Sequence, residues 1–389
     1  MELTLSTETV KYYRTVLKKS VSHEETMEMN VPDAQPDISR VVMTDGVVML
    51  RGKEAVSGNV SVSGLVNGAV LYMSEDSEAV QKLDYSLSFV MSAENPEVTS
   101  DTEILVKLLL TGIEAKTVNS RKVIIRANTE ACLECMNKTE LILSSGIKNA
   151  DGSSIETMCQ NERAVPASFV TEKRFVVTDE YKMPTTKPAL DEILTGSVNI
   201  VCDDVKTVGN KLIVKGTAFV TMLYTGKDGT GIASAEFQSV FSQILELDVK
   251  CDDSMFTVDI AITGVYLNAD DYNASGEQCI MVEVHAVAQC KAYVPMDLDL
   301  MTDLYSTKYA LDIARDEFEI KSLEGRDTIS EVFRDTIAIT EPVKAFLNST
   351  VRLGCMDVVE TDSGKKIVGV SFITVRYISE TDTLVAVSK

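Results

Sequence analysis

A twelve-residue phrase occurs twice in the chain, as VPDAQPDISRVV at residues 31–42 and as MPTTKPALDEIL at residues 183–194. Both copies carry two prolines at the same spacing, and the offset is constant because 184 − 32 = 188 − 36 = 152. The same offset joins further pairs downstream: Val62 and Val214, Gly64 and Gly216, Tyr72 and Tyr224, Phe89 and Phe241. A period of this length is the size of a domain, whereas solenoid repeats have about 20–50 residues. The sequence therefore predicts tandem duplicated domains.

A fainter third copy lies near the end of the chain. Gly369 and Tyr377 keep the spacing of the first copy, since 369 − 64 = 377 − 72 = 305. Ile329, Val332 and Phe333 resemble the apolar end of the repeated phrase, although the prolines are absent. We therefore expect four segments: an N-terminal helical arm at 1–30, a first repeat at 31–150, a second repeat with connecting strands at 151–315, and a partial third repeat at 316–389.

The matching stretches have the pattern of β-strands. Apolar residues at 212, 214, 218, 220 and 222 alternate with mostly polar neighbours, which is the period of a strand with one buried face. Further strands are predicted at 60–70, 103–110, 122–130, 257–264 and 280–288. The dipeptides Asp45-Gly46, Asp151-Gly152, Asp228-Gly229 and Ser363-Gly364 are typical of hairpin turns.

Two kinds of short helix are also predicted. Pro188 suits the first position of a helix, and Leu190, Ile193 and Leu194 would then share one face and plug the core. Residues 7–19 place Val10, Tyr13, Val16 and Leu17 on another helical face. The expected fold is thus mainly β, with tandem β-sandwich or open-barrel-like domains, short helical plugs and an N-terminal helix.

Composition and charge limit the kinds of partner that the protein can bind and the cell compartment in which we expect it. The net charge of −22 disfavours nucleic acid, because an acidic surface repels phosphate. The most apolar stretch, 104–110, is interrupted by Lys107 and is too short to span a bilayer. The start of the sequence has no basic, then apolar, signal pattern, so we expect a cytosolic protein. Eight cysteines in this length are too sparse for a disulfide framework, and they fit a reducing compartment.

No pattern in the sequence predicts catalytic, cofactor-binding or metal-ligating residues. The two histidines, His23 and His285, do not suggest a catalytic set. Cys132 and Cys135 form a CxxC without a second ligand pair, and on a strand their side chains would face opposite ways, so we interpret them as small strand residues. The glycine-rich stretch 225–231 fails the phosphate-loop pattern and is predicted to be a hairpin turn. The acidic pairs at 252–253 and 270–271 lack calcium-loop spacing.

Two functional classes remain on these grounds. One is an assembly protein that presents tandem β domains to protein partners, with self-association through exposed edge strands as a hypothesis. The other is a ligand- or glycan-binding β-repeat protein at the cell envelope. The absence of tryptophan counts against the glycan version, because sugar faces usually stack on aromatic rings.

Several phrases resemble a known family. The stretches ETMEMNVPDAQPDISRVVMTDG and VSVSGLVNGAVLY, with their echoes KMPTTKPALDEIL and LIVKGTAFVTMLY, resemble the SPOCS domain of SipL- and SpoVID-type sporulation proteins. The resemblance covers nearly the whole chain. It implies a non-enzymatic role in spore coat morphogenesis, in the mother-cell cytoplasm and at the forespore surface. It also implies binding to the coat basement-layer ATPase (SpoIVA type) or to other coat proteins. Relatives of the SipL kind often carry a LysM module, and residues 1–389 contain no segment resembling one.

Overall fold

The computed structural model describes residues 4–74, 79–148, 154–227, 231–247, 253–270, 278–326, 330–339, 341–362 and 364–389. Within these ranges the regular structure consists of β-strands, and no α-helix occurs. The strands pair into several small antiparallel sheets of two or three strands each. No helix capable of crossing a membrane is present in the described part of the chain.

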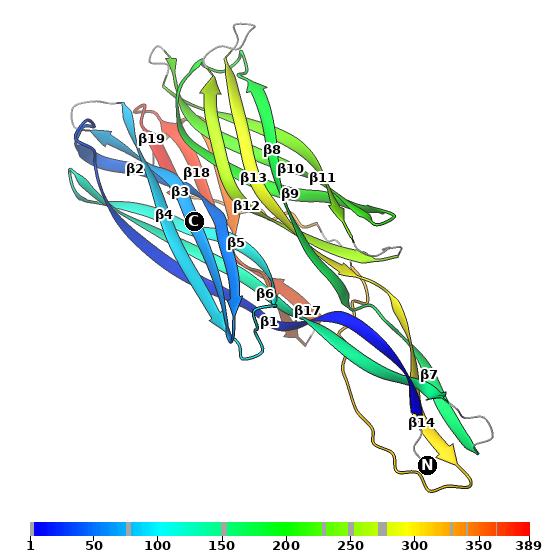
Figure 1. The fold of residues 1–389 in the computed structure, drawn as a ribbon. Helices are drawn as coiled ribbons and strands as arrows, with labels where there is room; N and C mark the ends of the chain where they lie inside the picture. Colours follow the sequence, from blue (N-terminus) through cyan, green and yellow to red (C-terminus); the bar gives the residue numbers. More distant parts are fainter. Residues whose placement is uncertain are drawn as a thin grey trace.

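We call the first group of strands the first unit (Figure 1, blue to teal). One of its sheets has the order β2-β3-β4 and the other has the order β1-β6-β5. The strands are β1 (Thr4–Asn30), β2 (Ile38–Val56), β3 (Asn59–Ser74), β4 (Val80–Glu94), β5 (Glu103–Asn119) and β6 (Lys122–Lys148). Alternate residues of both sheets, including Val62, Tyr72, Phe89 and Ile125, form one buried core. The two sheets therefore enclose a sandwich, because each presents one apolar face to the other.

The second unit has the same plan. Its sheets have the orders β11-β10-β9 and β12-β13-β8, and their inner faces share a second core around Tyr224, Phe241 and Val282. The strands are β8 (Ala167–Lys182), β9 (Leu190–Val208), β10 (Lys211–Gly226), β11 (Ile232–Glu246), β12 (Met255–Asp270) and β13 (Cys279–Tyr293). The starts of β9 and β10 lie 152 residues after those of β2 and β3, since 190 − 38 = 211 − 59 = 152.

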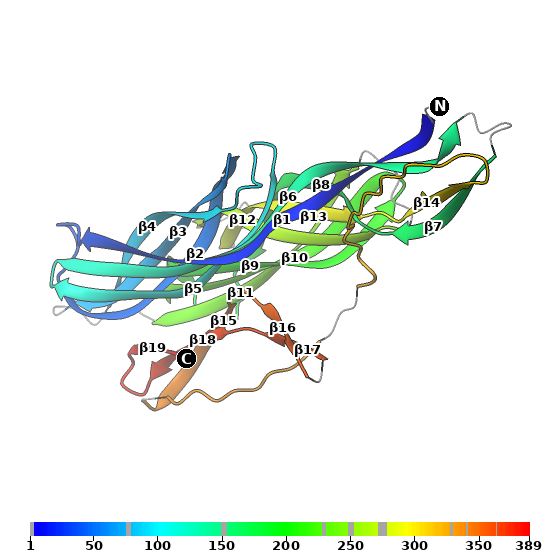
Figure 2. The ribbon, with the colours of Figure 1, turned by 90° about the horizontal axis from the view of Figure 1, so that it is seen from below.

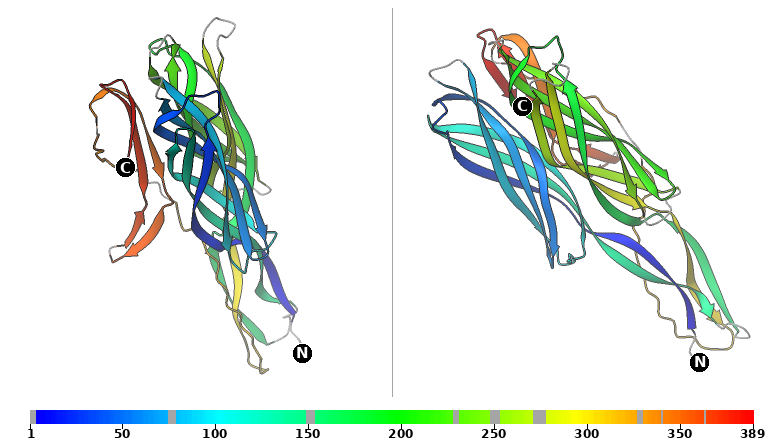
Figure 3. Two further views of the ribbon diagram at one scale, coloured as in Figure 1. Left: turned by 90° about the vertical axis from the view of Figure 1, so that its left-hand side faces the viewer. Right: turned by 45° about the horizontal axis from the view of Figure 1, so that its top comes forward.

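A three-stranded sheet near the C-terminus lies across both units (Figures 2 and 3, orange to red), and we call it the third sheet. Its order is β15-β18-β19, beside a small β16-β17 hairpin. The strands are β15 (Val343–Leu353), β16 (Asp357–Thr361), β17 (Gly364–Val368), β18 (Ser371–Ser379) and β19 (Leu384–Ser388). β15 starts 305 residues after β2 (343 − 38 = 305), which is the offset seen in the sequence. Tyr377 is buried, as are Tyr72 and Tyr224.

A narrow stalk extends away from the two units toward the N-terminus (Figure 1). It consists of the outer ends of β1 and β6 packed on a ribbon formed by β7 (Ile155–Ala164) and β14 (Met296–Ser306). Pro166 separates β7 from β8, and Pro295 separates β13 from β14. Proline lacks the N–H that a ladder needs, so both strands are interrupted at the same level. The β1–β6 ladder, by contrast, runs through from Asn30 to Thr4 with two register shifts.

The predicted N-terminal helix is wrong, because residues 7–19 lie within strand β1. Each position of this segment except Val16 pairs with a residue of β6, from Thr7 opposite Ser144 to Lys19 opposite Leu133. The ladder satisfies the backbone polar groups along the whole strand, and this tertiary pairing outweighs a local helical pattern. The six stretches predicted as strands all lie in strands, and the residues predicted to face the core of β10 are buried.

The hairpin predicted at Asp45-Gly46 is also wrong. Both residues lie in the middle of β2, where Asp45 pairs with Ala69 and Gly46 pairs with Gly68. The chain instead turns at Ser57-Gly58, between the paired residues Val56 and Asn59. Gly58 has a φ of 80°, which glycine adopts without strain. The dipeptides at 151–152 and 228–229 lie outside the described residues, as does Ser363.

A buried glutamine joins the first and second units. The side-chain amide of Gln289 in β13 hydrogen-bonds both backbone polar groups of Val106 in edge strand β5, at 3.0 Å and 2.7 Å. Nearby, Lys291 donates to Glu134 of β6 at 2.7 Å, and both side chains are largely shielded. Burial disfavours the charge of Lys291, but the hydrogen bond and charge of Glu134 leave its pKa raised. At Val106, the free edge of β5 is thus hydrogen-bonded by the second unit rather than by water.

Candidate functional site: repeated turns and a buried junction

The repeated phrase forms a turn rather than a helical plug. In the first copy Gln35 N donates to Pro32 O at 2.9 Å, and in the second Lys187 N donates to Pro184 O at 3.0 Å. Each turn links a strand of one sheet to the first residue of a strand in the facing sheet, either Ile38 or Leu190. The expectation that these apolar residues enter the core is confirmed, since both are buried. The helix is absent because each proline-flanked turn leads directly into a paired strand.

A tyrosine hydroxyl ties each turn to its own sheet. Tyr72 donates to Pro36 O at 3.1 Å, and Tyr224 donates to Pro188 O at 3.0 Å. In the third sheet the hydroxyl of Tyr377 accepts a weaker bond from Glu341 N at 3.4 Å. All three contacts join residues 36 positions apart. The same contact therefore occurs in the first and second units, and at the matching spacing in the third sheet the tyrosine accepts a bond instead of donating one.

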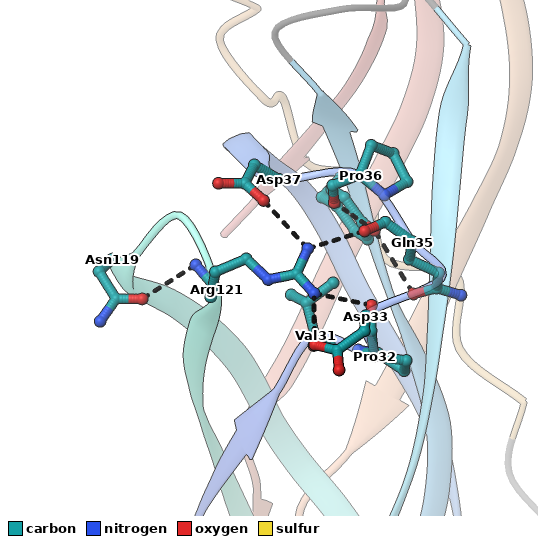
Figure 4. Close-up of polar contacts among 9 residues, drawn as sticks. Val31, Pro32, Asp33, Gln35, Pro36, Asp37, Asn119 and Arg121 are labelled. Carbon is teal, nitrogen blue, oxygen red and sulfur yellow. Dashed lines mark hydrogen bonds and ion pairs between the residues drawn. The ribbon is translucent and has the colours of Figure 1, made fainter.

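Arg121 clamps the first turn from the hairpin between β5 and β6 (Figure 4). Its Nη1 donates to Gln35 O at 2.7 Å, and its Nη2 donates to Pro32 O at 2.9 Å and to Val31 O at 3.1 Å. Its guanidinium also pairs with Asp37 at 3.0 Å. The hydrogen bonds of Asp37 to Ser120 and Arg121 lower the pKa of this carboxyl. A planar guanidinium suits this role because it can donate several bonds in fixed directions.

The second turn uses a different residue at the matching place. Met183 N donates to Gln278 O, just as Val31 N donates to Arg121 O. The side chain of Gln278 bonds both the N–H and the C=O of Leu190. The two turns thus share their backbone hydrogen bonds. A charged side chain, Arg121, holds the first turn, and a neutral one, Gln278, holds the second.

A buried ionic junction lies where the third sheet meets the first unit. Asp45 on β2 pairs with Arg376 of β18 at 2.8 Å and with Arg352 of β15 at 2.5 Å. Asp45 is 4% exposed and Arg376 is 1% exposed. Burial lowers the pKa of Arg376 while the charge of Asp45 opposes that effect. The buried Asp45 carboxylate and Arg376 guanidinium, with the partly exposed Arg352, depend on one another for stability.

Apolar side chains from all three parts surround this junction. The cluster combines Met43 and Leu71 of the first unit, Leu194 and Leu223 of the second unit, and Leu384 of the third sheet. The Ser234 hydroxyl of β11 also donates to Leu347 O of β15 at 2.7 Å. The third sheet is therefore packed against both units.

Tyr85 of β4 contacts the backbone of β2 at Asp45. Its hydroxyl donates to Asp45 O at 2.9 Å, and burial raises the pKa of this phenol. A Cβ on Gly68 would lie 1.9 Å from Asp45 O, and one on Gly46 would lie 2.5 Å from the Tyr85 hydroxyl. The two cross-strand glycines are required because strands and ring approach too closely for a side chain.

A groove of about 650 Å³ runs beside the junction, between the first and second units. Its wall is largely apolar and includes Met27, Met29, Met49 and Leu267, with polar groups from Asn67 and Lys82. Flexible methionine side chains adapt to differently shaped apolar surfaces.

A disulfide joins Cys132 of β6 to Cys355 after β15, which corrects the interpretation of Cys132 as a small strand residue. A disulfide also departs from the reducing compartment that the cysteine count favoured. Their Cα atoms are 6.2 Å apart and the two residues are 223 positions apart in sequence. The backbone N–H of Cys355 also donates to Glu130 at 2.7 Å. Cys135 faces the core, as the strand pattern predicts, and burial raises the pKa of its thiol to about 11. Spacing within the sequence gave no sign that Cys132 meets a residue of the third sheet.

The two histidines lie in different units of the structure. His23 contacts Glu25 in the first unit, and His285 contacts Glu283 in the second. The 225–231 stretch connects the paired strands β10 and β11, and residues 228–230 of the predicted turn lie outside the described residues. Asp252 and Asp271 also lie outside the described residues. Among the described residues, no three or more His, Cys, Asp or Glu side chains form a group that could hold a metal ion.

Sequence reasoning missed Asp45, Arg352 and Arg376. A signal existed in the repeat register, because Arg352 and Arg376 align with Val47 and Leu71 (352 − 47 = 376 − 71 = 305). Charged residues at positions that are apolar in another copy indicate a surface that pairs with an opposite charge. The equivalence proposed for Val332 and Phe333 is wrong, because both side chains are highly exposed, and Ile329 lies outside the described residues.

These features define a chain of β-units, each entered through a tyrosine-tied turn. Comparison with protein families gives the class a name: the family described as SipL, SPOCS domain, matches residues 37–118 and 190–270. Residues 37–118 in the first unit and 190–270 in the second unit are therefore each similar to the SPOCS domain of this family. The two matched regions end 152 residues apart (270 − 118 = 152), in agreement with the repeat. No curated protein matches the chain, and no solved structure matches it.

Proposed function

We propose that this protein is a non-enzymatic scaffold in the assembly of the bacterial endospore coat. The observation that carries the proposal is the presence of two SPOCS regions in one chain. The proposed setting is the mother-cell cytoplasm, with recruitment to the forespore surface. The proposed partners are the coat basement-layer ATPase (SpoIVA type) or other coat proteins.

The arrangement of the sheets supports a scaffold role. Gln289 and Lys291 fix the second unit on the first, and the Asp45 junction fixes the third sheet on both. Buried hydrogen bonds and ion pairs of this kind favour one relative position of the parts they join, although Nε of Arg376 has no hydrogen-bond partner among the described residues. We further propose that the first unit, the second unit and the third sheet descend from one duplicated domain. The shared offsets and the three tyrosine contacts support this origin.

Localisation during sporulation tests the proposed function. A fluorescently tagged copy is expected to form a shell around the forespore and to become diffuse when the basement-layer ATPase is deleted. Diffuse fluorescence in both growing and sporulating cells would contradict the coat role. A shell that persists without the ATPase would direct the search to another coat protein as the recruiting partner.

The alternative, a ligand-binding protein at the envelope, has the groove beside Asp45 as its candidate site. The methionine-rich wall favours an apolar ligand over a sugar, since Tyr85 is the only aromatic residue among the groove-lining residues described, and it lies against glycines. Thermal shift measurements with fatty acids and with peptidoglycan fragments distinguish the two ligand classes.

A further inference from the structure

The third sheet is attached to the rest of the chain by a connection that leaves room for rearrangement. The connection is held by the second unit as far as Arg326, whose guanidinium bonds Phe256 O. Sixteen residues then lead to the start of β15 (342 − 327 + 1 = 16), and the described ones contain no strand. Such a segment can span about 50 Å when extended. Apart from the Cys132–Cys355 disulfide, the position of the third sheet is therefore set by its noncovalent docking contacts rather than by a short chain connection.

The docking contacts join acidic side chains of the first unit to basic side chains of the third sheet. The first unit supplies two acidic groups, Asp45 and Glu130, and the third sheet supplies Arg352, Arg376 and the N–H of Cys355. Asp45 accepts both guanidinium groups, and Glu130 accepts the backbone N–H at 2.7 Å. Charge complementarity of this kind selects one partner surface and disfavours others.

Each chain carries one such acceptor and one such third sheet. We propose that the third sheet of one chain also docks on the first unit of a second copy, so that the contacts seen within the chain link neighbouring copies. In this domain-swapped state Arg352 and Arg376 of one copy meet Asp45 of the next. Thiol–disulfide exchange replaces the internal Cys132–Cys355 bond with the same bond between copies, so that one disulfide breaks for each one that forms. An exchange between identical elements forms no new type of contact and therefore has a low free-energy cost.

The geometry of exchange determines the product. One donor sheet and one acceptor on each chain give a head-to-tail contact, which produces closed rings or open chains. The exchange is favoured at high local concentration, because the internal contact competes through its effective concentration. This inference deepens the proposed scaffold role by naming a second copy of this protein as a partner.

Two complementary cysteine variants of the full chain test the exchange. Cys132→Ser retains the donor cysteine and Cys355→Ser retains the acceptor cysteine, so neither variant can close the internal disulfide. Both carry Cys159→Ser, because Cys159 is exposed and could cross-link without docking. The mixture is oxidised with glutathione disulfide, which is reduced to two glutathione molecules as two protein thiols form one disulfide.

We expect a covalent heterodimer in the mixture and in neither variant alone, with its yield rising with protein concentration. Peptide mass spectrometry should identify a Cys132–Cys355 link between chains. Adding Arg352→Ala and Arg376→Ala to the donor chain should reduce the yield at least tenfold, because the guiding charges are gone. Absence of the link at every concentration, or a yield unaffected by the arginine changes, would overturn the inference.

Sedimentation of the unmodified protein provides a test that does not depend on variants folding. After reduction, dimers and larger species should increase with concentration, and monomers at every concentration would contradict the exchange. The coat role is tested separately by localisation. A forespore shell without the cross-link would overturn only the exchange, whereas the cross-link with diffuse fluorescence would overturn only the coat role.

Discussion

Gln289 contacts Val106 through both ends of its side-chain amide, so that a residue of the second unit completes the hydrogen bonding of an edge strand in the first. Gln289 is 2% exposed and also accepts a bond from Lys53 at 3.1 Å. A primary amide can imitate a peptide group, since it offers one donor and one acceptor side by side. The interface thus resembles strand pairing carried out by a single side chain.

Removal of this amide should weaken the contact between units. Gln289→Ala leaves the N–H and C=O of Val106 buried without these partners, and we expect a loss of about 1–3 kcal/mol of stability. Urea unfolding followed by circular dichroism measures the change. Gln238→Ala is the matched control, because Gln238 is exposed on β11 and should change stability by less than about 0.5 kcal/mol. Equal effects of the two changes would contradict this interpretation.

Neutralisation of Asp45 should be more severe. Asp45→Asn keeps the shape of the side chain but leaves Arg352 and Arg376 without their counter-charge, and we expect a loss of about 3–5 kcal/mol. The midpoint of urea unfolding reports this loss. Asp84→Asn changes an exposed carboxylate in the same sheet and should have an effect below about 1 kcal/mol. A stable Asp45→Asn protein would show that packing alone holds the third sheet.

The close approach at Gly68 predicts intolerance of even one methyl group. Gly68→Ala would place Cβ 1.9 Å from Asp45 O and 2.5 Å from the Tyr85 hydroxyl, which forces the strands apart. We expect destabilisation of at least about 1–3 kcal/mol from overpacking. Gly146→Ala is the control, because no atom lies within 4 Å of its added Cβ. Differential scanning calorimetry compares the melting temperatures, and a similar value for both variants would refute the packing argument.

Loss of the Arg121 guanidinium should loosen the first turn. Arg121→Ala removes donors to three backbone carbonyls, and we expect a loss of about 1–3 kcal/mol. Hydrogen exchange should increase at the amides of the turn while exchange in the second unit stays unchanged. Arg40→Ala, which removes an exposed arginine near the start of β2, should leave the turn protected.

The carboxyl group of Asp37 provides a pH-dependent test of the same contact. Its pKa is lowered in the folded chain by the hydrogen bonds of Ser120 and then of Arg121. The stabilisation is therefore complete above the unfolded pKa of about 4 and is lost as the pH falls through the lower folded value. NMR titration should show the pKa of Asp37 rising in Arg121→Ala. An unchanged titration would show that Arg121 does not act on this carboxyl.

The sequence predicted the β class and the repeated strands because alternation and the 152-residue offset survive in single residues. It failed at residues 7–19, where a pattern compatible with a helix is overridden by pairing with a strand more than 100 positions away. It failed at Asp45-Gly46 because the sequence does not distinguish a glycine that makes a turn from one that leaves room for an aromatic side chain, as Gly46 does for Tyr85. Local patterns cannot report such contacts, since the deciding partner lies elsewhere in the chain.

The site was less predictable than the fold. The buried acid on β2 and the two arginines of the third sheet are about 300 positions apart, and each is an ordinary residue in its own stretch. The disulfide partner of Cys132 was hidden for the same reason, because pairing cannot be read from spacing alone. Only comparison of the copies marks Arg376, which matches Leu71 and Leu223, as a departure from an apolar pattern, and Arg352 departs from Val47 of the first copy alone.

The two prolines that interrupt the strands above the stalk have a mechanical consequence. Val165-Pro166 and Val294-Pro295 break the second unit's strands at one level, whereas β1 and β6 continue past it as a ladder from Asn30 to Thr4. A force on the tip of the stalk is then borne by the first unit along the axis of its longest strands, where many hydrogen bonds resist together. The ladder of the second unit ends at Ala167 and Tyr293, and that of the β7–β14 ribbon begins at Ala164 and Met296, so no ladder pair bridges the two prolines. In the stalk, the β1–β6 pair is thus continuous with the first unit, whereas the β7–β14 ribbon is joined to the second unit through proline-containing connections.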